Sequence, residues 1–98
     1  MLEVEIQVPP KSNTNRIVEV VERVCLDAQL TCTLKGTLKS YLGSIHWHYK
    51  KANESGTLEI TWWEKKNRLW FKVANGRKGL WIPQIVPQIK IEIEKLLQ

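Results

Sequence analysis

The 98-residue sequence lacks the segments that mark membrane and secreted proteins. No apolar run approaches the roughly 20 residues that span a bilayer, and the start of the chain lacks the positive and apolar regions of a signal peptide. Low-complexity runs and internal repeats are also absent from the sequence. We therefore expect one folded domain over residues 1–98, with a cytoplasmic location and no membrane partner.

Cysteine is scarce, with only Cys25 and Cys32 in the chain. Two cysteines do not make a disulfide framework, and their spacing is not the Cys-x-x-Cys of metal and redox sites. Cys25 falls on the apolar stripe of an expected helix, and Cys32 alternates in phase with Leu30 and Leu34 on an expected strand. The pattern predicts two buried free thiols.

Catalytic and cofactor motifs are missing as well. No Ser-His-Asp, Cys-His or paired-carboxylate arrangement is signalled in the sequence. The glycine-containing loop at residues 75–79 has neither Walker nor Rossmann spacing. We expect a protein that is not an enzyme and that carries no cofactor.

Positive charge and tryptophan, in contrast, are concentrated in one part of the chain. The formal net charge is +5, yet residues 35–78 hold ten Lys and Arg against three Glu, together with four of the five tryptophans. This asymmetry indicates an anionic partner, and nucleic acid is the commonest one. The alternative is a solvated basic face that keeps the protein soluble.

Alternation of apolar and polar residues predicts strands with one buried face. The expected strands are residues 2–8, a strand that begins at Leu30, and a three-stranded meander at residues 45–49, 58–63 and 69–73. The apolar parity changes after Leu42, which requires a bulge or turn, and residues 42–44 are the expected turn.

Helical spacing occurs in two segments. Capping residues place the start of the first helix close to Thr14, and an apolar stripe at residues 17–28 gives it about four turns. A second stripe covers residues 82–97. Pro87 would cost that helix a hydrogen bond, so we expect its regular part to start there, after a shorter turn at residues 83–86.

The resulting order, β-α-β-β-β-β-α, predicts an α+β two-layer architecture: a five-stranded antiparallel sheet with two helices on one face. Over the whole chain this order resembles one repeat of the TATA-binding-protein-like fold, and less closely the helix-grip folds that hold apolar ligands. The resemblance is one of topology without a family motif, so it implies no function.

Parity divides the side chains of the meander between two faces. The set expected to face the helices is Trp47, Ile60, Trp62, Phe71 and Val73. The set expected on the opposite face is His46, His48, Lys50, Glu59, Thr61, Trp63, Trp70 and Lys72. An outward pair of tryptophans on adjacent strands would be a large apolar area to leave in water.

We therefore take the outer face as the candidate binding site. Two indoles beside Arg68 and Lys72 offer a platform on which bases stack, and the basic turns attract phosphates. The predicted nucleic-acid or partner-binding residues are Trp63, Trp70, Lys72, His46, His48, Lys50, Lys65, Lys66, Arg68, Arg77 and Lys78. Arg77 and Lys78 also precede the second helix, where a phosphate can dock, although a turn with exposed charges is the alternative.

Other interpretations of the same face stay open. A second chain covers it in a protein-interaction or homodimer module, or Trp63 and Trp70 pack on each other or beneath a loop and bind nothing. An apolar-ligand carrier, with a cavity between sheet and helices, is a further alternative. Trp81 is expected to pack as a plug between the loop and the sheet.

His46 and His48 stand two apart on a strand and therefore project to the same side. A metal site would need a third ligand, for which Glu59 has suitable parity. We interpret the two histidines as ordinary residues of the polar face and expect no metal.

Overall fold

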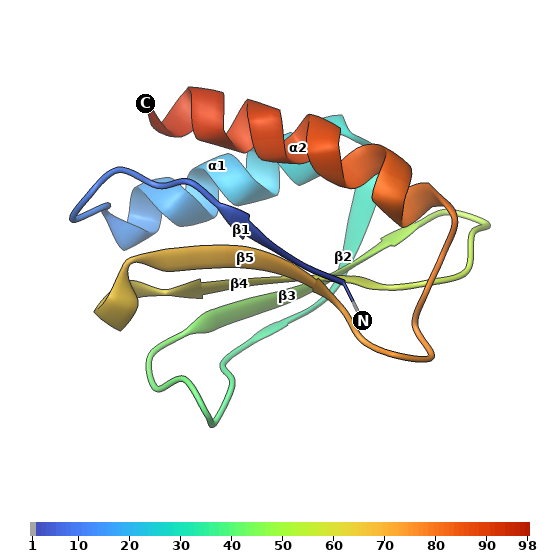
Figure 1. The fold of residues 1–98 in the computed structure, drawn as a ribbon, viewed down its shortest axis with the longest axis horizontal. Coiled ribbons are helices and arrows are strands. Elements are labelled where there is room, and N and C mark those ends of the chain that lie inside the picture. The colour runs from blue at the N-terminus through green and yellow to red at the C-terminus, as the bar shows by residue number, and fades with distance from the viewer. Residues whose placement is uncertain (1) are drawn as a thin grey trace.

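The computed structural model describes residues 2–98 and has the expected order of elements (Figure 1). The elements are β1 (Leu2–Ile6), α1 (Thr14–Asp27), β2 (Leu30–Gly36), β3 (Ile45–Lys51), β4 (Leu58–Trp63), the 3-10 turn η1 (Glu64–Lys66), β5 (Arg68–Val73) and α2 (Trp81–Leu97). The strands pair antiparallel in one sheet, in the order β1-β5-β4-β3-β2. Both helices cover one face of it, which confirms the predicted two-layer α+β architecture.

The core lies between this inner face and the two helices. The residues expected to face the helices are all buried, and Trp47 and Trp62 are 0% exposed. Each of these indoles also satisfies its polar N–H on α1: Trp47 Nε1 donates to Glu22 Oε2 at 3.0 Å, and Trp62 Nε1 donates to Thr14 Oγ1 at 3.0 Å. A buried tryptophan needs such a partner, so the two rings fix α1 over the sheet.

Helix α1 begins at Thr14, as the sequence predicts. The side chain of Asn13 caps it, since Asn13 Oδ1 accepts a hydrogen bond from the backbone N–H of Arg16 at 3.1 Å. The predicted stripe is buried against the sheet and α2, at Ile17, Val20, Val21, Val24 and Cys25. Tertiary packing offsets the low helix propensity of its valines.

Helix α2 is one continuous helix, so the prediction that its regular part starts at Pro87 is wrong. Pro87 lies within the helix and removes one backbone hydrogen bond, the one its missing N–H would have made to Pro83. Burial of Ile82, Val86, Ile89 and Ile93 along one stripe outweighs that loss. Trp81 is buried at the start of the helix, and its Nε1 donates to the carbonyl oxygen of Ser55 at 2.8 Å.

Strand β2 differs from the prediction because it contains a bulge. Cys32 pairs with Tyr49 and Leu34 pairs with His48, so the register shifts at Thr33. This insertion turns Leu34 to the outer face, and β2 lies at the sheet edge, where Cys32 is exposed. The prediction of a buried thiol is confirmed for Cys25 and wrong for Cys32.

Within residues 2–98, neither helix is long and apolar enough to cross a membrane.

The two thiols are expected to differ sharply in reactivity. Burial raises the pKa of Cys25 to about 12, and a buried, protonated thiol is inert. Iodoacetamide should therefore modify Cys32 in the native protein and reach Cys25 only in urea, which mass spectrometry of peptides measures. Cys32→Ser should leave the native protein unlabelled. Equal labelling of both thiols in the native state would contradict this burial.

Candidate functional site

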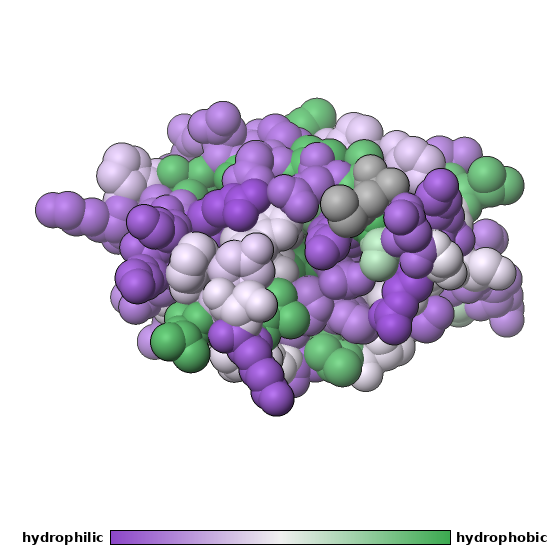
Figure 2. Space-filling model, turned by 60° about the horizontal axis from the view of Figure 1, so that its bottom comes forward, coloured by the Kyte–Doolittle hydropathy of each residue, from purple (hydrophilic) through white to green (hydrophobic). Residues whose placement is uncertain are grey.

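Two rows of paired side chains cross the outer face of the sheet. Partners in an antiparallel pair project to the same face. The first row consists of Leu34, His48, Glu59, Lys72 and Glu3, and the second consists of Gly36, His46, Thr61, Trp70 and Glu5. Figure 2, in which the bottom of Figure 1 comes forward, shows a mostly hydrophilic face with scattered hydrophobic side chains.

A cavity of about 640 Å³, which we call the outer cavity, opens over these rows. Strands β3, β4 and β5 contribute His46, His48, Glu59 and Lys72. The remaining lining comes from β2 with the residues after it and from the loop between β5 and α2: Leu34, Lys35, Gly36, Thr37, Leu38, Ala74 and Arg77. Histidine and glutamate side chains of the central strands therefore line the same cavity as Lys35, Lys72 and Arg77.

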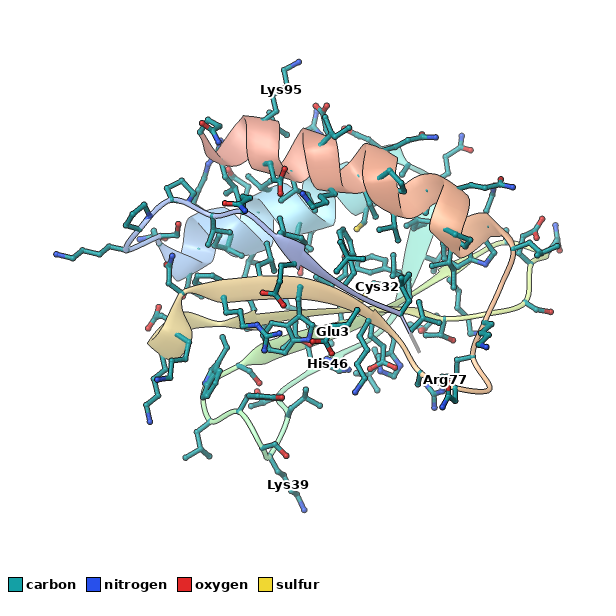
Figure 3. All side chains as sticks on the ribbon, in the orientation of Figure 1. Glu3, Cys32, Lys39, His46, Arg77 and Lys95 are labelled. Carbon is teal, nitrogen blue, oxygen red and sulfur yellow. The ribbon has the colours of Figure 1, made fainter. Side chains whose placement is uncertain are left out.

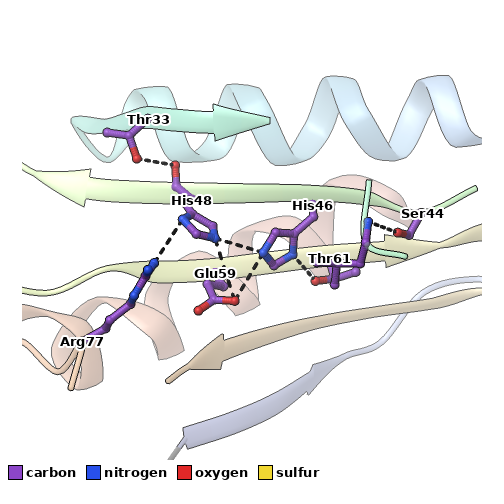
Figure 4. A network of polar contacts seen from close by, with 8 residues as sticks. Thr33, Ser44, His46, His48, Glu59, Thr61 and Arg77 are labelled. Carbon is purple, nitrogen blue, oxygen red and sulfur yellow. Dashed lines mark hydrogen bonds and ion pairs between the residues drawn. The ribbon is translucent and has the colours of Figure 1, made fainter. Parts of the chain in front are cut away.

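His46, His48 and Glu59 point toward one another inside the outer cavity (Figure 4). His46 Nε2 lies 3.0 Å from His48 Nε2 and 3.3 Å from Glu59 Oε1, and His48 Nε2 lies 3.9 Å from Glu59 Oε1. His46 is 5% exposed, and its Nδ1 lies 2.7 Å from Thr61 Oγ1. Burial lowers the pKa of His46, which favours the neutral imidazole.

The loop between β5 and α2 places Arg77 at the edge of the outer cavity. Arg77 Nη1 lies 3.4 Å from Nδ1 of His48. Figure 4 shows the guanidinium directed at that ring. The loop is held against the turn between β3 and β4, because the carbonyl oxygen of Arg77 accepts a hydrogen bond from the N–H of Thr57 at 2.9 Å. Gly56 and Gly79 allow the two backbones to touch, since a Cβ on Gly56 would lie 2.8 Å from Gly79 Cα.

Trp63 and Trp70 project outward as predicted, but the segment between β2 and β3 covers them. The ring of Tyr41 packs edge-on against both indoles, with its centroid 4.8 Å from that of Trp63 and 5.3 Å from that of Trp70. Trp63 is half-buried and donates from Nε1 to the carbonyl oxygen of Leu42 at 3.1 Å. Trp70 is 3% exposed. Of the alternatives that the sequence left open for the two outward rings, packing beneath a loop is what the structure has.

Arg68 is a second predicted residue whose surroundings differ from the expectation. Its guanidinium lies 4.0 Å above the ring of Trp70 and forms ion pairs with Glu3 at 3.1 Å and Glu5 at 2.5 Å. Two carboxylates compensate its charge, so Arg68 is poorly placed to hold a phosphate. Its contacts instead fix β1 to β5 on the outer face.

The remaining predicted cations lie in three places. Lys65 and Lys66 are exposed in η1, directly after Trp63. Trp63 lies about 13 Å along β4 from Glu59, because a strand rises about 3.3 Å per residue. Lys50 is exposed near the other end of the sheet and donates from Nζ to the carbonyl oxygen of Gly56 at 3.3 Å. Lys78 is exposed and faces a different cavity. The structure brings together His46, His48, Lys72 and Arg77 from the predicted set, and separates the rest.

That different cavity is apolar and has a volume of about 570 Å³. It opens where the inner side of β1 and β5 meets the first turn of α2, and it is lined by Leu2, Ser55, Val73, Lys78, Gly79, Leu80, Ile82 and Pro83. If the protein were an apolar-ligand carrier, this cavity is where the ligand would bind.

Sequence reasoning missed Tyr41 as part of the outer face, and it missed the contact of Glu3 and Glu5 with Arg68. The alternation of β1 does place both glutamates outward, but their contact with Arg68 depends on β1 pairing with β5, which the sequence does not specify. Tyr41 lies in an irregular segment without periodicity, so no pattern indicated its position.

Comparisons with protein-family models, with curated proteins and with solved structures each find no match.

The contact between the two loops predicts a strong effect of Gly79→Ala. The new Cβ would overlap the carbonyl oxygen of Ser55 and crowd the indole of Trp81. Urea unfolding should show a loss of about 1–3 kcal/mol in the free energy of unfolding. Gly36→Ala is the matched control, because a Cβ there meets no atom within 4 Å. Equal stabilities of the two variants would refute the close contact.

Tyr41 should be important for the stability of the outer face. Tyr41→Ala removes the ring that covers Trp63 and Trp70, and we expect a loss of about 1–2 kcal/mol in unfolding free energy, with greater quenching of tryptophan fluorescence by acrylamide. The neighbouring side chain of Leu42 is 80% exposed, so Leu42→Ala should change neither measurement. Unchanged quenching in Tyr41→Ala would contradict the role of Tyr41 in covering the two indoles.

Proposed function

We propose that the protein binds nucleic acid, single-stranded or structured, through phosphate contacts at the outer cavity. The observation that carries this proposal is the position of Lys72 and Arg77, which both line the outer cavity. Among residues 2–98, neither cation forms an ion pair with a carboxylate. Cations without a carboxylate partner at a concave surface attract phosphate most strongly.

The contrast with the paired cations supports this choice of surface. Arg68 is paired with Glu3 and Glu5, and Lys35 Nζ lies 2.6 Å from Glu22 Oε2. The exposed side chain of Lys50 adds positive charge two residues beyond His48 on β3. The excess positive charge of residues 35–78 therefore lies in two places, which are the end of the sheet at the outer cavity and η1.

Trp63 gives the proposed surface its aromatic component. It is half-exposed and stands beside Lys65 and Lys66, so a base could stack there while phosphates follow the sheet to Lys72. The distance of about 13 Å along β4 corresponds to a few nucleotides. Trp70 has no such role in this arrangement, because Tyr41 and Arg68 cover it.

The protein-interaction or homodimer alternative uses the same face and has weaker support. Its hydrophobic side chains are scattered rather than contiguous (Figure 2), and contiguous apolar area is what stabilises a dimer interface. A dimer mass that survives high salt in light scattering would favour this alternative over nucleic-acid binding.

The test is fluorescence anisotropy with labelled single-stranded RNA, single-stranded DNA and an RNA hairpin, across a series of salt concentrations. Lys72→Gln and Arg77→Gln should each weaken binding to all sequences and reduce the slope of log affinity against log salt by about 1. Lys95→Gln is the matched control, because Lys95 is exposed on α2, on the opposite side of the molecule (Figure 3).

Two results would contradict the proposal. One is the absence of binding to all three probes at low salt. The other is an equal loss of affinity in Lys95→Gln and in Lys72→Gln, which would assign the binding to diffuse charge rather than to the outer cavity.

A further inference from the structure

We propose that His46, His48 and Glu59 bind one divalent transition-metal ion, with zinc as the best match, in the outer cavity. These three side chains converge from the two central neighbouring strands β3 and β4. The proposal goes beyond nucleic-acid binding and does not depend on it. It also replaces our expectation from the sequence that the two histidines are ordinary residues of the polar face.

The separations of the three ligand atoms lie within about 0.5 Å of those in a tetrahedral zinc site. His46 Nε2, His48 Nε2 and Glu59 Oε1 are 3.0, 3.3 and 3.9 Å apart. Ligands about 2.0–2.1 Å from a tetrahedral zinc ion lie about 3.3–3.4 Å from one another. The point about 2.0 Å from all three atoms lies in the plane of these atoms, so tetrahedral coordination requires His48 Nε2 and Glu59 Oε1 to approach each other by about 0.5 Å.

The surroundings of His46 prepare its Nε2 as a ligand. Nδ1 of His46 lies 2.7 Å from Thr61 Oγ1. When the neutral ring donates its N–H from Nδ1 to this oxygen, Nε2 keeps its lone pair, which faces the other two ligands. The ring is buried and held between two strands, so little conformational entropy is lost when the ion binds. Figure 4 shows Nε2 of His46 directed at both His48 and Glu59.

The three ligands leave the fourth position open. Their side chains line the outer cavity, with exposed fractions of 6% for His46, 18% for His48 and 12% for Glu59. Two histidines, one carboxylate and an open position are typical of zinc sites that accept an exogenous ligand, whereas structural zinc sites are closed by four protein ligands. Water or an anion would complete the coordination.

Lys72 and Arg77 face the same cavity and oppose a bound cation. One carboxylate against a divalent ion and two basic side chains leaves excess positive charge, which favours an anion as the fourth ligand. Arg77 also points Nη1 at His48 Nδ1, and arginine only donates. This contact places the His48 hydrogen on Nε2. Metal binding moves that hydrogen to Nδ1, so Arg77 must turn away.

The chain has few other side chains that bind transition metals, which simplifies the test. His46 and His48 are its only histidines. Cys32 is an exposed thiol that could bind zinc nonspecifically, so all titrations use a Cys32→Ser background. The probes are Zn²⁺ followed by calorimetry and Co²⁺ followed by visible absorption, which is diagnostic of tetrahedral coordination, in chloride buffer without nucleic acid.

We expect one ion bound per chain. Glu59→Gln and His48→Gln should each raise the dissociation constant at least about tenfold and weaken the cobalt absorption. Glu54→Gln is the matched control, since Glu54 is an exposed carboxylate in the turn between β3 and β4. Arg77→Gln should bind zinc at least as tightly as the parent while it weakens nucleic-acid binding, so the two proposals can fail separately.

The absence of saturable binding at one ion per chain would overturn the metal site. So would a Glu59→Gln variant with the affinity of the parent. Because either substitution could perturb the fold, stability is measured alongside, and the ¹⁵N shifts of both imidazole rings in the Cys32→Ser protein give a second readout. Added Zn²⁺ should shift the Nε2 resonances of both rings, and unchanged resonances would also overturn the proposal.

Discussion

Coverage of one sheet face by both helices is the constraint on which the outer surface depends. Trp47 and Trp62 anchor α1 over the inner face, and alternation along each strand then forces their neighbours to the other side. His46 and His48 flank Trp47, so they have no position available except the outer face. The polar cluster is thus a consequence of the same pattern that builds the core.

Irregular segments turn this polar face into a cavity. The segment after β2 supplies Thr37 and Leu38 to the lining, and the loop between β5 and α2 supplies Ala74 and Arg77. Contact between the backbones of Gly56 and Gly79 holds that loop in place. The central strands therefore provide the titratable groups, while the loops determine how much of each group water can reach.

The strand-level features were predictable because they follow from periodicity. The order of elements, the inner set of the meander and the start of α1 at Asn13–Thr14 are all local patterns, and the structure confirms them. The suitable parity of Glu59 relative to the two histidines was also visible in the sequence. Its closeness to them was not, because that depends on the register of β3 with β4.

The failures share one physical origin, which is tertiary contact between segments distant in sequence. A bulge at Thr33 and an edge position expose Cys32, and packing of the whole apolar stripe carries α2 through Pro87. Burial of Trp70 needs Tyr41, from a segment without periodicity, and the neutralisation of Arg68 needs β1 beside β5.

An amide NMR titration of the ¹⁵N-labelled protein with a short single-stranded RNA tests the role of the outer cavity most directly. The account predicts shifts at His48, Lys72 and Arg77, with smaller ones toward Trp63, and none on the exposed side of α2. Shifts confined to the helices, or to the apolar cavity at Leu80, would contradict it.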